Sequence, residues 1–371
     1  MMKAIEKKVY DLLDKGLIPD FLLRIAIRAL CRQRLREIGA SQNDNTFAKQ
    51  HAAKMAFIED LKGRSIAEQQ SRANEQHYEV PTEFMMSCLG PRAKYSACLY
   101  PTGRETLAQA EEACFEEYCV KTRLEDGLEV LDLGCGWGSL TLFLAEKYPN
   151  SRIVGISNSS TQREHILGVA KEKGFENVEI ITADVNSFDF SDGRTFDRIL
   201  SIEMFEHMKN YDALLKKVAS WLRPRRIQNN EDKAIERESL LFVHIFCHKD
   251  TPYHFVEDDG WMAQTFFSGG TMPSHDLLLY FQSDVTLINS WFVNGKHYSR
   301  TLEDWLRLQD SNSKEGLSVL EKDAKEKGLD PVEGRKAFYR FRVFYMACSE
   351  LFGLNGGEEW GVGHYLFKRK D

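Results

Sequence analysis

Between residues 128 and 247, short apolar runs alternate with segments whose apolar positions recur at helical spacing. The runs predict five buried strands, at residues 128–133, 152–157, 177–182, 196–202 and 239–246. The segments between them predict amphipathic helices at residues 139–148, 161–174 and 212–224. Strands that alternate with helices predict an α/β fold, in which helices cover both faces of a parallel sheet.

The regions on either side of this core have different patterns. Residues 3–38 have helical periodicity, and residues 40–75 continue as polar helix and connector. The sequence predicts helices near 301–310, 315–327 and 332–352 and a final strand within 358–370. We therefore predict N-terminal helices at 1–75, the sheet core at 76–247, and a mostly helical substrate-binding cap with final strands at 248–371. A polar, charged insertion at 224–238 is interpreted as an exposed loop.

The N-terminal helical region has a basic stripe beside an apolar face. The stripe consists of Arg24, Arg28, Arg32 and Arg36, and the apolar face includes Phe21, Leu22, Ile25 and Ala29. Such a helix can lie on a membrane surface. It can also pack against the protein or a second copy and leave the basic stripe in solvent. We favour the packed helix, because a basic amphipathic pattern is weak evidence for membrane binding.

The composition is that of a globular protein with an acidic balance. The 371 residues are 43% hydrophobic and 28% charged, and 49 Lys and Arg against 56 Asp and Glu give a net charge of −7. This balance disfavours nucleic acid as a partner. The eight cysteines are scattered without CxxC pairs, and neither a signal peptide nor a membrane-spanning run is evident. We expect a cytoplasmic protein without a metal site.

The most specific motif joins the first predicted strand to the helix after it. Gly134, Gly136 and Gly138 follow the strand, and such glycines allow a ligand to approach the backbone closely. A dinucleotide site would have GxGxxG spacing and an acid about 20 residues on. Here the spacing is GxGxG, and the second strand ends at Ser157 without an acid. The pattern is typical of the nucleotide loop of S-adenosylmethionine-dependent methyltransferases.

Asp184 and Val185 follow the third predicted strand. The Asp184 carboxylate can accept a hydrogen bond from the adenine amine of the cofactor, while Val185 packs on the adenine ring. The aspartate could instead cap the next turn. Because the glycine loop lies upstream, we favour cofactor binding.

Several long motifs carry a family resemblance. They lie at residues 134–138, 155–166, 202–211, 242–249, 266–274, 277–285 and 294–305. Together they resemble the plant alkaloid N-methyltransferases (coclaurine, pavine and tetrahydroprotoberberine enzymes), which belong to the cyclopropane-fatty-acid-synthase-like methyltransferases. The resemblance spans roughly residues 65–371 apart from the insertion, and it implies a Rossmann-like sheet that binds S-adenosylmethionine.

The same resemblance implies roles for further cofactor-binding residues. The amides of Asn158 and Gln162 would hold the ribose, in place of the acid of a dinucleotide site. Tyr95 and Ser96 would form a cofactor-contacting turn ahead of the sheet. Ile202 would line the cofactor.

Two carboxylates and an imidazole, those of Glu203, Glu206 and His207, follow the fourth predicted strand. Ligands of such sheets bind at the carboxyl ends of strands. An amine is mostly protonated near neutral pH, and only its free lone pair attacks a methyl group, so Glu or His must take or hold the proton. The resemblance implies Glu206 and His207 as the catalytic pair, with Glu203 as an auxiliary carboxylate.

We therefore predict methyl transfer from S-adenosylmethionine to the amine nitrogen of a small aromatic alkaloid, of benzylisoquinoline, protoberberine or phenylalkylamine type. Aromatic walls suit such a flat cation. The cap residues that could supply these walls are Phe246, Tyr253, His254, Phe255, Trp261, Phe266, Phe267, Tyr280, Phe281, Trp291 and Tyr298. A glutamate within residues 75–83 could also reach the amine, or be simply exposed.

The main alternative is a lipid-modifying cyclopropane synthase. The synthases that this chain resembles use a Cys in a Tyr-Ser-Cys turn, and Ala97 stands at that place here. Cys348 matches another cysteine of those enzymes, and we interpret it as a buried structural thiol. A third hypothesis, a cofactor-fold protein without catalysis, is disfavoured because both carboxylates and the imidazole are intact.

Overall fold

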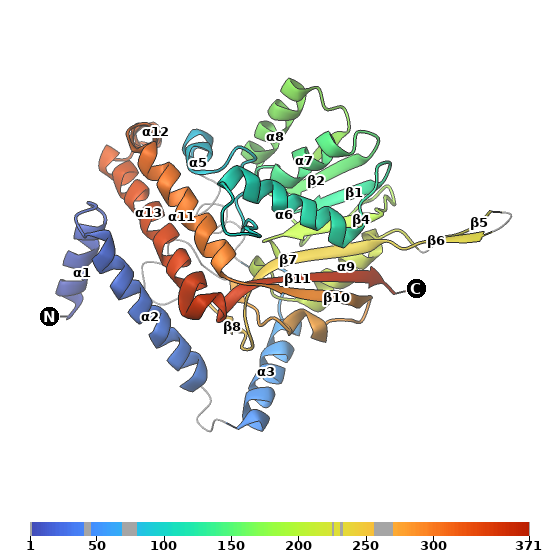
Figure 1. The fold of residues 1–371 in the computed structure, drawn as a ribbon, viewed down its shortest axis with the longest axis horizontal. Helices are drawn as coiled ribbons and strands as arrows, with labels where there is room; N and C mark the ends of the chain where they lie inside the picture. The colour runs from blue at the N-terminus through green and yellow to red at the C-terminus, as the bar shows by residue number, and fades with distance from the viewer. Residues whose placement is uncertain are drawn as a thin grey trace.

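The computed structural model describes residues 2–40, 46–68, 80–224, 226–230, 233–255 and 270–370. A seven-stranded sheet lies at its centre (Figure 1). The strands are β1 (Glu129–Leu133), β2 (Arg152–Ser157), β3 (Val178–Thr182), β4 (Arg198–Ile202), β7 (Leu240–His248), β10 (Val285–Val293) and β11 (Trp360–Arg369). Their order across the sheet is β10-β11-β7-β4-β1-β2-β3. Strands β1, β2, β3, β4 and β7 are parallel, whereas β11 runs antiparallel to both β7 and β10.

The predicted α/β fold is confirmed, with all five core strands and the final strand β11. Strand β10 is an addition that the sequence pattern does not predict. It lies at the edge of the sheet, and most of its residues are only partly buried. The C-terminal region therefore supplies the last two strands of the sheet as well as the cap helices.

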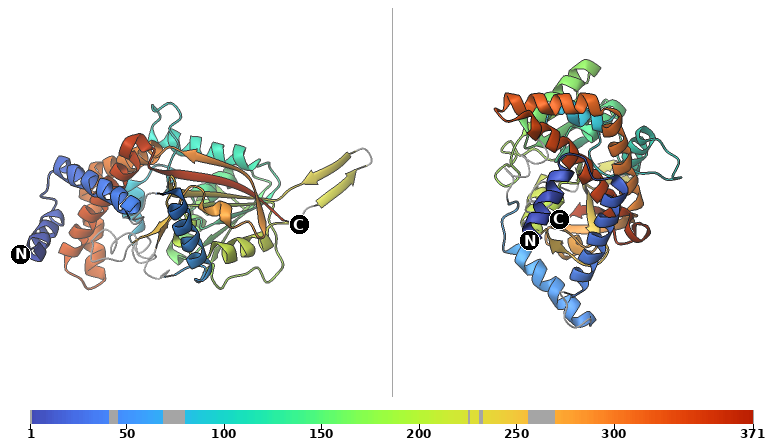
Figure 2. Two further views of the ribbon diagram at one scale, coloured as in Figure 1. Left: turned by 90° about the horizontal axis from the view of Figure 1, so that it is seen from below. Right: turned by 90° about the vertical axis from the view of Figure 1, so that its left-hand side faces the viewer.

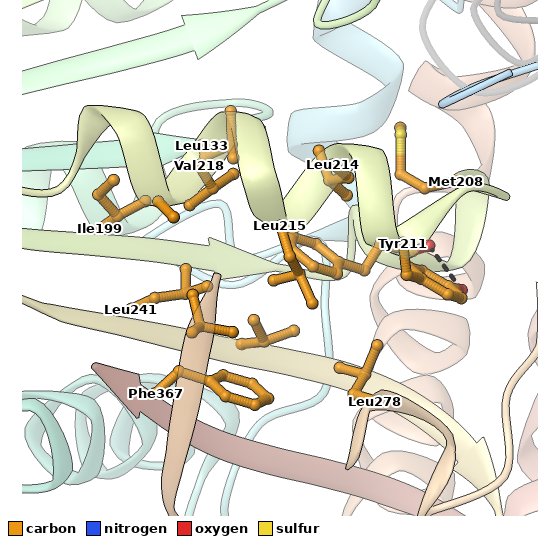
Figure 3. Close-up of a cluster of buried hydrophobic side chains, with 14 of the residues drawn as sticks. Leu133, Ile199, Met208, Tyr211, Leu214, Leu215, Val218, Leu241, Leu278 and Phe367 are labelled. Carbon is orange, nitrogen blue, oxygen red and sulfur yellow. Dashed lines mark hydrogen bonds between the residues drawn. The ribbon is translucent and has the colours of Figure 1, made fainter. Parts of the chain in front are cut away.

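Helices cover both faces of the sheet. Helices α6 (Leu107–Thr122), α7 (Ser139–Lys147) and α8 (Ser160–Lys173) lie on one face, and α3 (Phe47–Lys62) and α9 (Tyr211–Trp221) on the other. In α9, Leu214, Leu215 and Val218 point toward the strands, as Figure 3 shows. Burying one such side chain contributes roughly 1.5–3 kcal/mol. The Asn210 side chain accepts the Ala213 N–H and caps the first turn of this helix.

The cap consists of α5 (Thr82–Cys88), α11 (Lys296–Ser311), α12 (Ser313–Glu326) and α13 (Pro331–Gly353), with α2 (Asp20–Ala40) beside α13. Its own apolar core includes Trp305, Phe338, Phe341 and Tyr345. The shorter elements are α1 (Met2–Leu13), η1 (Phe205–His207), β8 (Tyr253–His254), β9 (Thr271–Met272), η2 (Leu277–Tyr280) and η3 (Leu354–Gly357).

The N-terminal region differs from the prediction in two ways. It forms two helices, α1 and α2, separated by a turn with Gly16 at φ +65° and Pro19. Two members of the basic stripe of α2 also face the protein, whereas Arg32 and Arg36 are exposed as expected. Arg24 bonds to Glu303 and Glu350, and Arg28 bonds to Glu350, so these cations pack against the body of the protein.

The apolar face of α2 is exposed instead, with Phe21, Leu22, Ile25 and Leu30 all among the exposed large hydrophobic residues. The expectation that the basic stripe faces solvent is therefore wrong for Arg24 and Arg28. The physical reason is that carboxylates of α11 and α13 meet the guanidinium groups, and charge-assisted bonds of this kind are the strong ones.

The charged insertion forms a hairpin rather than a loop. Strands β5 (Arg226–Asn230) and β6 (Lys233–Arg237) pair antiparallel, from Arg226 opposite Arg237 to Asn230 opposite Lys233. The hairpin extends away from the sheet (Figures 1 and 2). Among the described residues, no helix has both the length and the apolar character needed to cross a membrane.

Candidate active site

The glycine loop after β1 has the conformation that its sequence requires. Gly134, Gly136 and Gly138 have φ values of +84°, +51° and +80°, a region that other residues rarely adopt. A side chain at Gly134 would meet Met204 at 2.7 Å, and one at Gly138 would meet Ile166 at 2.5 Å. A Cβ on Gly136 would meet no atom within 4 Å. The loop therefore leaves open space in front of Gly136.

That space belongs to a cavity at the carboxyl ends of β1 and β4. Five of the predicted cofactor residues line it, namely Tyr95, Ser96, Gly134, Gly136 and Ile202. Lys94, Asp132 and Glu203 line it as well. The structure thus brings the turn before the sheet, the glycine loop and the end of β4 to one place.

The other four predicted cofactor residues lie at the ends of β2 and β3, and they do not line this cavity. Asn158 is exposed, whereas Gln162 is buried, and its Nε2 has no hydrogen-bond partner in the described part of the chain. Asp184 is exposed and accepts the Asn186 N–H at 2.7 Å, so it does cap the next turn. Val185 packs in the core beneath the sheet.

Glu203 is the first residue after β4, and its backbone has φ +49°, which is rare for a residue with a side chain. Its carboxylate is buried and surrounded by donors. Oε1 accepts the Ala97 N–H at 2.8 Å and lies 3.1 Å from Nε2 of His244, and Oε2 accepts the Tyr298 hydroxyl at 2.6 Å. Burial raises the pKa of Glu203, and the Lys94 charge and these hydrogen bonds oppose that rise.

Glu206, unlike Glu203, has one carboxyl oxygen that no described donor reaches. It lies in η1 and is buried, but its Oε2 has no hydrogen-bond partner among the described residues. Burial raises the pKa of Glu206 well above its ordinary value, and the negative charge of Glu203 raises it further. His207, the next residue, is partly buried, and its charge acts to lower the pKa of Glu203. The pKa is therefore raised in both carboxyls, and the charge of Glu203 adds to the rise at Glu206.

Two residues that contact this site, Lys94 and His244, are not predicted from the sequence. Lys94 is buried, and its ammonium donates to Ser96 Oγ at 2.5 Å and to the Ala97 carbonyl at 2.7 Å. His244 is a polar residue inside an otherwise apolar predicted strand, and that pattern could have pointed to it. Tyr298 was proposed only as a pocket wall, yet its hydroxyl bonds to Glu203.

Several other candidates do not line this cavity or lie outside the described residues. Glu83 is exposed on α5, and residues 75–79 lie outside the described residues, as do Trp261, Phe266 and Phe267. Cys348 is buried in the cap, as expected.

Comparisons with known proteins show which family the chain belongs to. The family described as mycolic acid cyclopropane synthetase matches residues 66–327. (S)-coclaurine N-methyltransferase of Thalictrum flavum subsp. glaucum is 37% identical over 99% of this chain and 97% of its own length. The Papaver somniferum enzyme of the same name is 35% identical over 100% of this chain and 99% of its own. This chain belongs to the plant alkaloid N-methyltransferase family.

A solved coclaurine N-methyltransferase, bound to N-methylheliamine and SAH, superposes with a TM-score of 0.87 at 34% identity, covering 98% of this chain and all of that one. Members of the family use S-adenosylmethionine, the cofactor predicted from the glycine loop. The open space at Gly136 fits that cofactor, and so does Nε2 of Gln162, which has no hydrogen-bond partner among the described residues. The cyclopropane synthase of Escherichia coli K12 is more distant, at 29% identity over 62% of this chain and 54% of its own.

The glycine loop gives a first testable prediction. Gly136→Val should weaken S-adenosylmethionine binding by roughly 5–150-fold, because overfilling a packed space costs about 1–3 kcal/mol. Isothermal titration calorimetry measures the loss. The matched control is Gly174→Val, since Gly174 has φ +72° and also has no atom within 4 Å of an added Cβ, but caps α8. Normal affinity in Gly136→Val would contradict the assignment of the loop.

Proposed function

We propose that this chain is an N-methyltransferase that transfers a methyl group from S-adenosylmethionine to the amine nitrogen of a small aromatic alkaloid. The observation that carries the proposal is the pair of buried carboxyls with opposite surroundings beside the cofactor cavity. A cationic amine needs one group that attracts its charge and another that takes its proton.

Glu203 is proposed to attract the amine. It receives hydrogen bonds from Ala97 and Tyr298 and lies near Lys94, which stabilise its charged form. A carboxylate fixed by several donors can hold an ammonium group in line with the methyl donor, and such positioning lowers the barrier to attack.

Glu206 is proposed to take the proton, with His207 beside it as the second member of the pair. Its raised pKa brings its proton affinity closer to that of an amine. The N–H bond breaks and the proton moves to the Glu206 carboxylate, which frees the nitrogen lone pair. The lone pair forms the new N–C bond, and the electron pair of the old C–S bond stays on sulfur. S-adenosylmethionine supplies the methyl group on a positively charged sulfur.

The assignments of the cofactor residues are also proposals. Tyr95, Ser96, Gly134, Gly136 and Ile202 are supported by their shared cavity. Nε2 of Gln162, without a partner in the part of the chain that the structure describes, supports a ribose contact, which we extend to Asn158. For Asp184 and Val185, the support is their place at the end of β3, beside β2. The division into N-terminal helices, core and cap at residues 75 and 247 is kept as a proposal.

The cyclopropane synthase alternative is disfavoured by the surroundings of Ala97. Its backbone N–H bonds to Glu203, and its side chain is an apolar methyl group that can hold no ion. We also propose a cytoplasmic location, supported by eight free and buried cysteines.

We propose in addition that the chain forms a homodimer through α2. The support is the exposed apolar stripe of Phe21, Leu22, Ile25 and Leu30, with Ala26 and Ala29 also exposed between them. Small residues between large ones allow two such helices to approach closely, and a two-fold interface uses the same patch twice.

The methyl acceptor can be identified directly. Incubated with S-adenosylmethionine, the protein should add one methyl group to secondary or tertiary aromatic amines of the three predicted types, detected by mass spectrometry. Analogues with oxygen in place of the nitrogen should remain unmodified. If unsaturated phospholipids gained the extra carbon and amines did not, the lipid alternative would replace this proposal.

The role of Glu206 predicts a pH dependence. Glu206→Gln should lower turnover near neutral pH by about 10²–10⁴-fold, and it should recover as pH rises, because the amine then loses its proton to water. In the parent protein, kcat/KM should fall as pH drops through the raised pKa of Glu206, since the base becomes protonated. The comparison variant Glu203→Gln should raise KM and keep an acid limb, moved to lower pH because the Glu203 charge no longer raises the pKa of Glu206. If the loss of turnover in Glu206→Gln did not change with pH, Glu206 would position the substrate and would not take its proton.

The dimer predicts a change of mass in solution. Ile25→Lys places a charge in the middle of the apolar stripe and should convert a dimer to a monomer in sedimentation velocity. Val120→Lys is the matched control, because Val120 is equally apolar and 76% exposed, but on α6. A parent protein that sediments as a monomer would refute the proposal.

A further inference from the structure

Behind Glu203, a line of polar side chains runs through the sheet to α6. His244 Nε2 lies 3.1 Å from Oε1 of Glu203, and His244 Nδ1 lies 2.9 Å from Nε2 of His364. His364 Nδ1 lies 2.7 Å from Nζ of Lys121, which also pairs with Glu117. Both histidines are only 2% exposed, whereas Glu117 reaches solvent. The line therefore connects a buried carboxylate to a charged pair near the surface.

The fold fixes each member of this line. His244 of β7 and His364 of β11 stand directly opposite each other in the sheet, with ring centroids 4.8 Å apart. Lys121 belongs to α6, and its ammonium lies 4.6 Å from the ring centre of Trp291 in β10. Three elements from distant parts of the sequence thus meet at the two histidines.

The chemistry of the partners sets the direction of each hydrogen bond. A lysine ammonium can only donate, so Nδ1 of His364 must accept and Nε2 must carry the hydrogen. That N–H donates to Nδ1 of His244, and therefore His244 also carries its hydrogen on Nε2. The His244 N–H then donates to Glu203. The Tyr118 hydroxyl, 2.8 Å from Nδ1 of His244, can donate to the same acceptor and favours the same form.

Burial and the nearby lysine charges keep the pKa values of both histidines well below the ordinary value, so both rings are neutral and the tautomer is the variable that matters.

We infer that Lys121, acting through His364 and His244, is a positioning residue that holds Glu203 as a hydrogen-bond acceptor in its charged form. This inference rests on the proposed role of Glu203 in attracting the amine. Without the ammonium, Nδ1 of His364 no longer meets the Lys121 donor and can carry the ring hydrogen instead. The ring N–H groups of His364 and His244 can then both point away from Glu203. In that arrangement His244 Nε2 is an acceptor, and Glu203 must be protonated to donate a hydrogen bond to it.

The reversed line is balanced in protons. The His244 Nε2 proton moves to Glu203, the His364 Nε2 proton moves to His244 Nδ1, and His364 Nδ1 takes one proton from solvent, so each ring stays neutral and Glu203 becomes protonated. Lys94, Glu206, His207 and Tyr298 also act on Glu203, and they are unchanged in the variants below. They cannot select the tautomer of His364, because the contact at its Nδ1 is with Lys121.

The tautomers can be observed by NMR of the ¹⁵N-histidine-labelled full chain, with His244→Gln and His364→Gln used to assign the signals. In the parent protein, both rings should show hydrogen on Nε2 and none on Nδ1. Lys121→Met should move hydrogen onto Nδ1 of His364, whereas Lys121→Arg, which keeps a donor, should retain the parent pattern. Lys147→Met is the matched control, because Lys147 also pairs with a glutamate of α6, Glu116, but contacts neither histidine.

The same variants are then compared in methyl transfer. Lys121→Met should raise KM for a cationic amine about tenfold, the effect of a modest loss of charge attraction, with a smaller change in kcat and a thermal midpoint like that of Lys147→Met. Unchanged tautomers in Lys121→Met, or changed tautomers with unchanged KM, would overturn the inference. If the parent protein methylated no amine while the tautomers changed as expected, the proposed function would fail and the action of Lys121 on the histidines would stand.

Discussion

The arrangement of this site depends on the burial of one negative charge at the end of β4. An ionised carboxylate removed from water costs several kcal/mol unless it is paired and hydrogen-bonded. Glu203 meets that requirement with donors from three parts of the chain: Ala97 from the turn before the sheet, Tyr298 from the cap, and His244 from β7. Each hydrogen bond to a charged group contributes about 1.5–3 kcal/mol. The charge therefore holds turn, cap and sheet together at the place where the cofactor cavity opens.

The need of a buried charge for hydrogen-bond donors also explains why burial shifts the pKa values of Glu203 and Glu206 to different extents. The left-handed backbone at Glu203 turns the chain sharply after β4, so that Glu203 faces the donors, whereas Glu206 lies within the short helix η1 and is buried. Glu206 finds no donor there for Oε2, and it also lies within the field of Glu203. Hydrogen-bond donors surround Glu203, whereas Oε2 of Glu206 has none among the described residues. The surroundings therefore shift the two pKa values differently, although both residues are glutamates.

The sequence predicts those features that depend on neighbours along the chain. The strands, their helices and the glycine loop each follow from a local pattern, and the loop adopts the conformation that its glycines indicate. Pairings between distant segments have no such signal. The contact of Arg24 with Glu303 joins residues 279 positions apart, and for that reason the solvent-facing side of α2 was assigned wrongly. A polar side chain faces solvent only when no buried partner is available to it. Periodicity in the sequence carries no information about such partners.

The donors of Glu203 show the same limit at the site itself. His244 lies in a strand recognised from its apolar character, and His364 lies in the final strand, yet nothing in either segment indicates that the two rings meet. Their meeting depends on the register of β11 against β7, because a shift by one residue would move His364 to the opposite face of the sheet. The extra strands beyond β7 therefore do more than enlarge the core. They bring a second histidine against the first and carry the influence of a lysine near the surface to the buried carboxylate, so the register of a distant strand becomes part of the chemistry of the site.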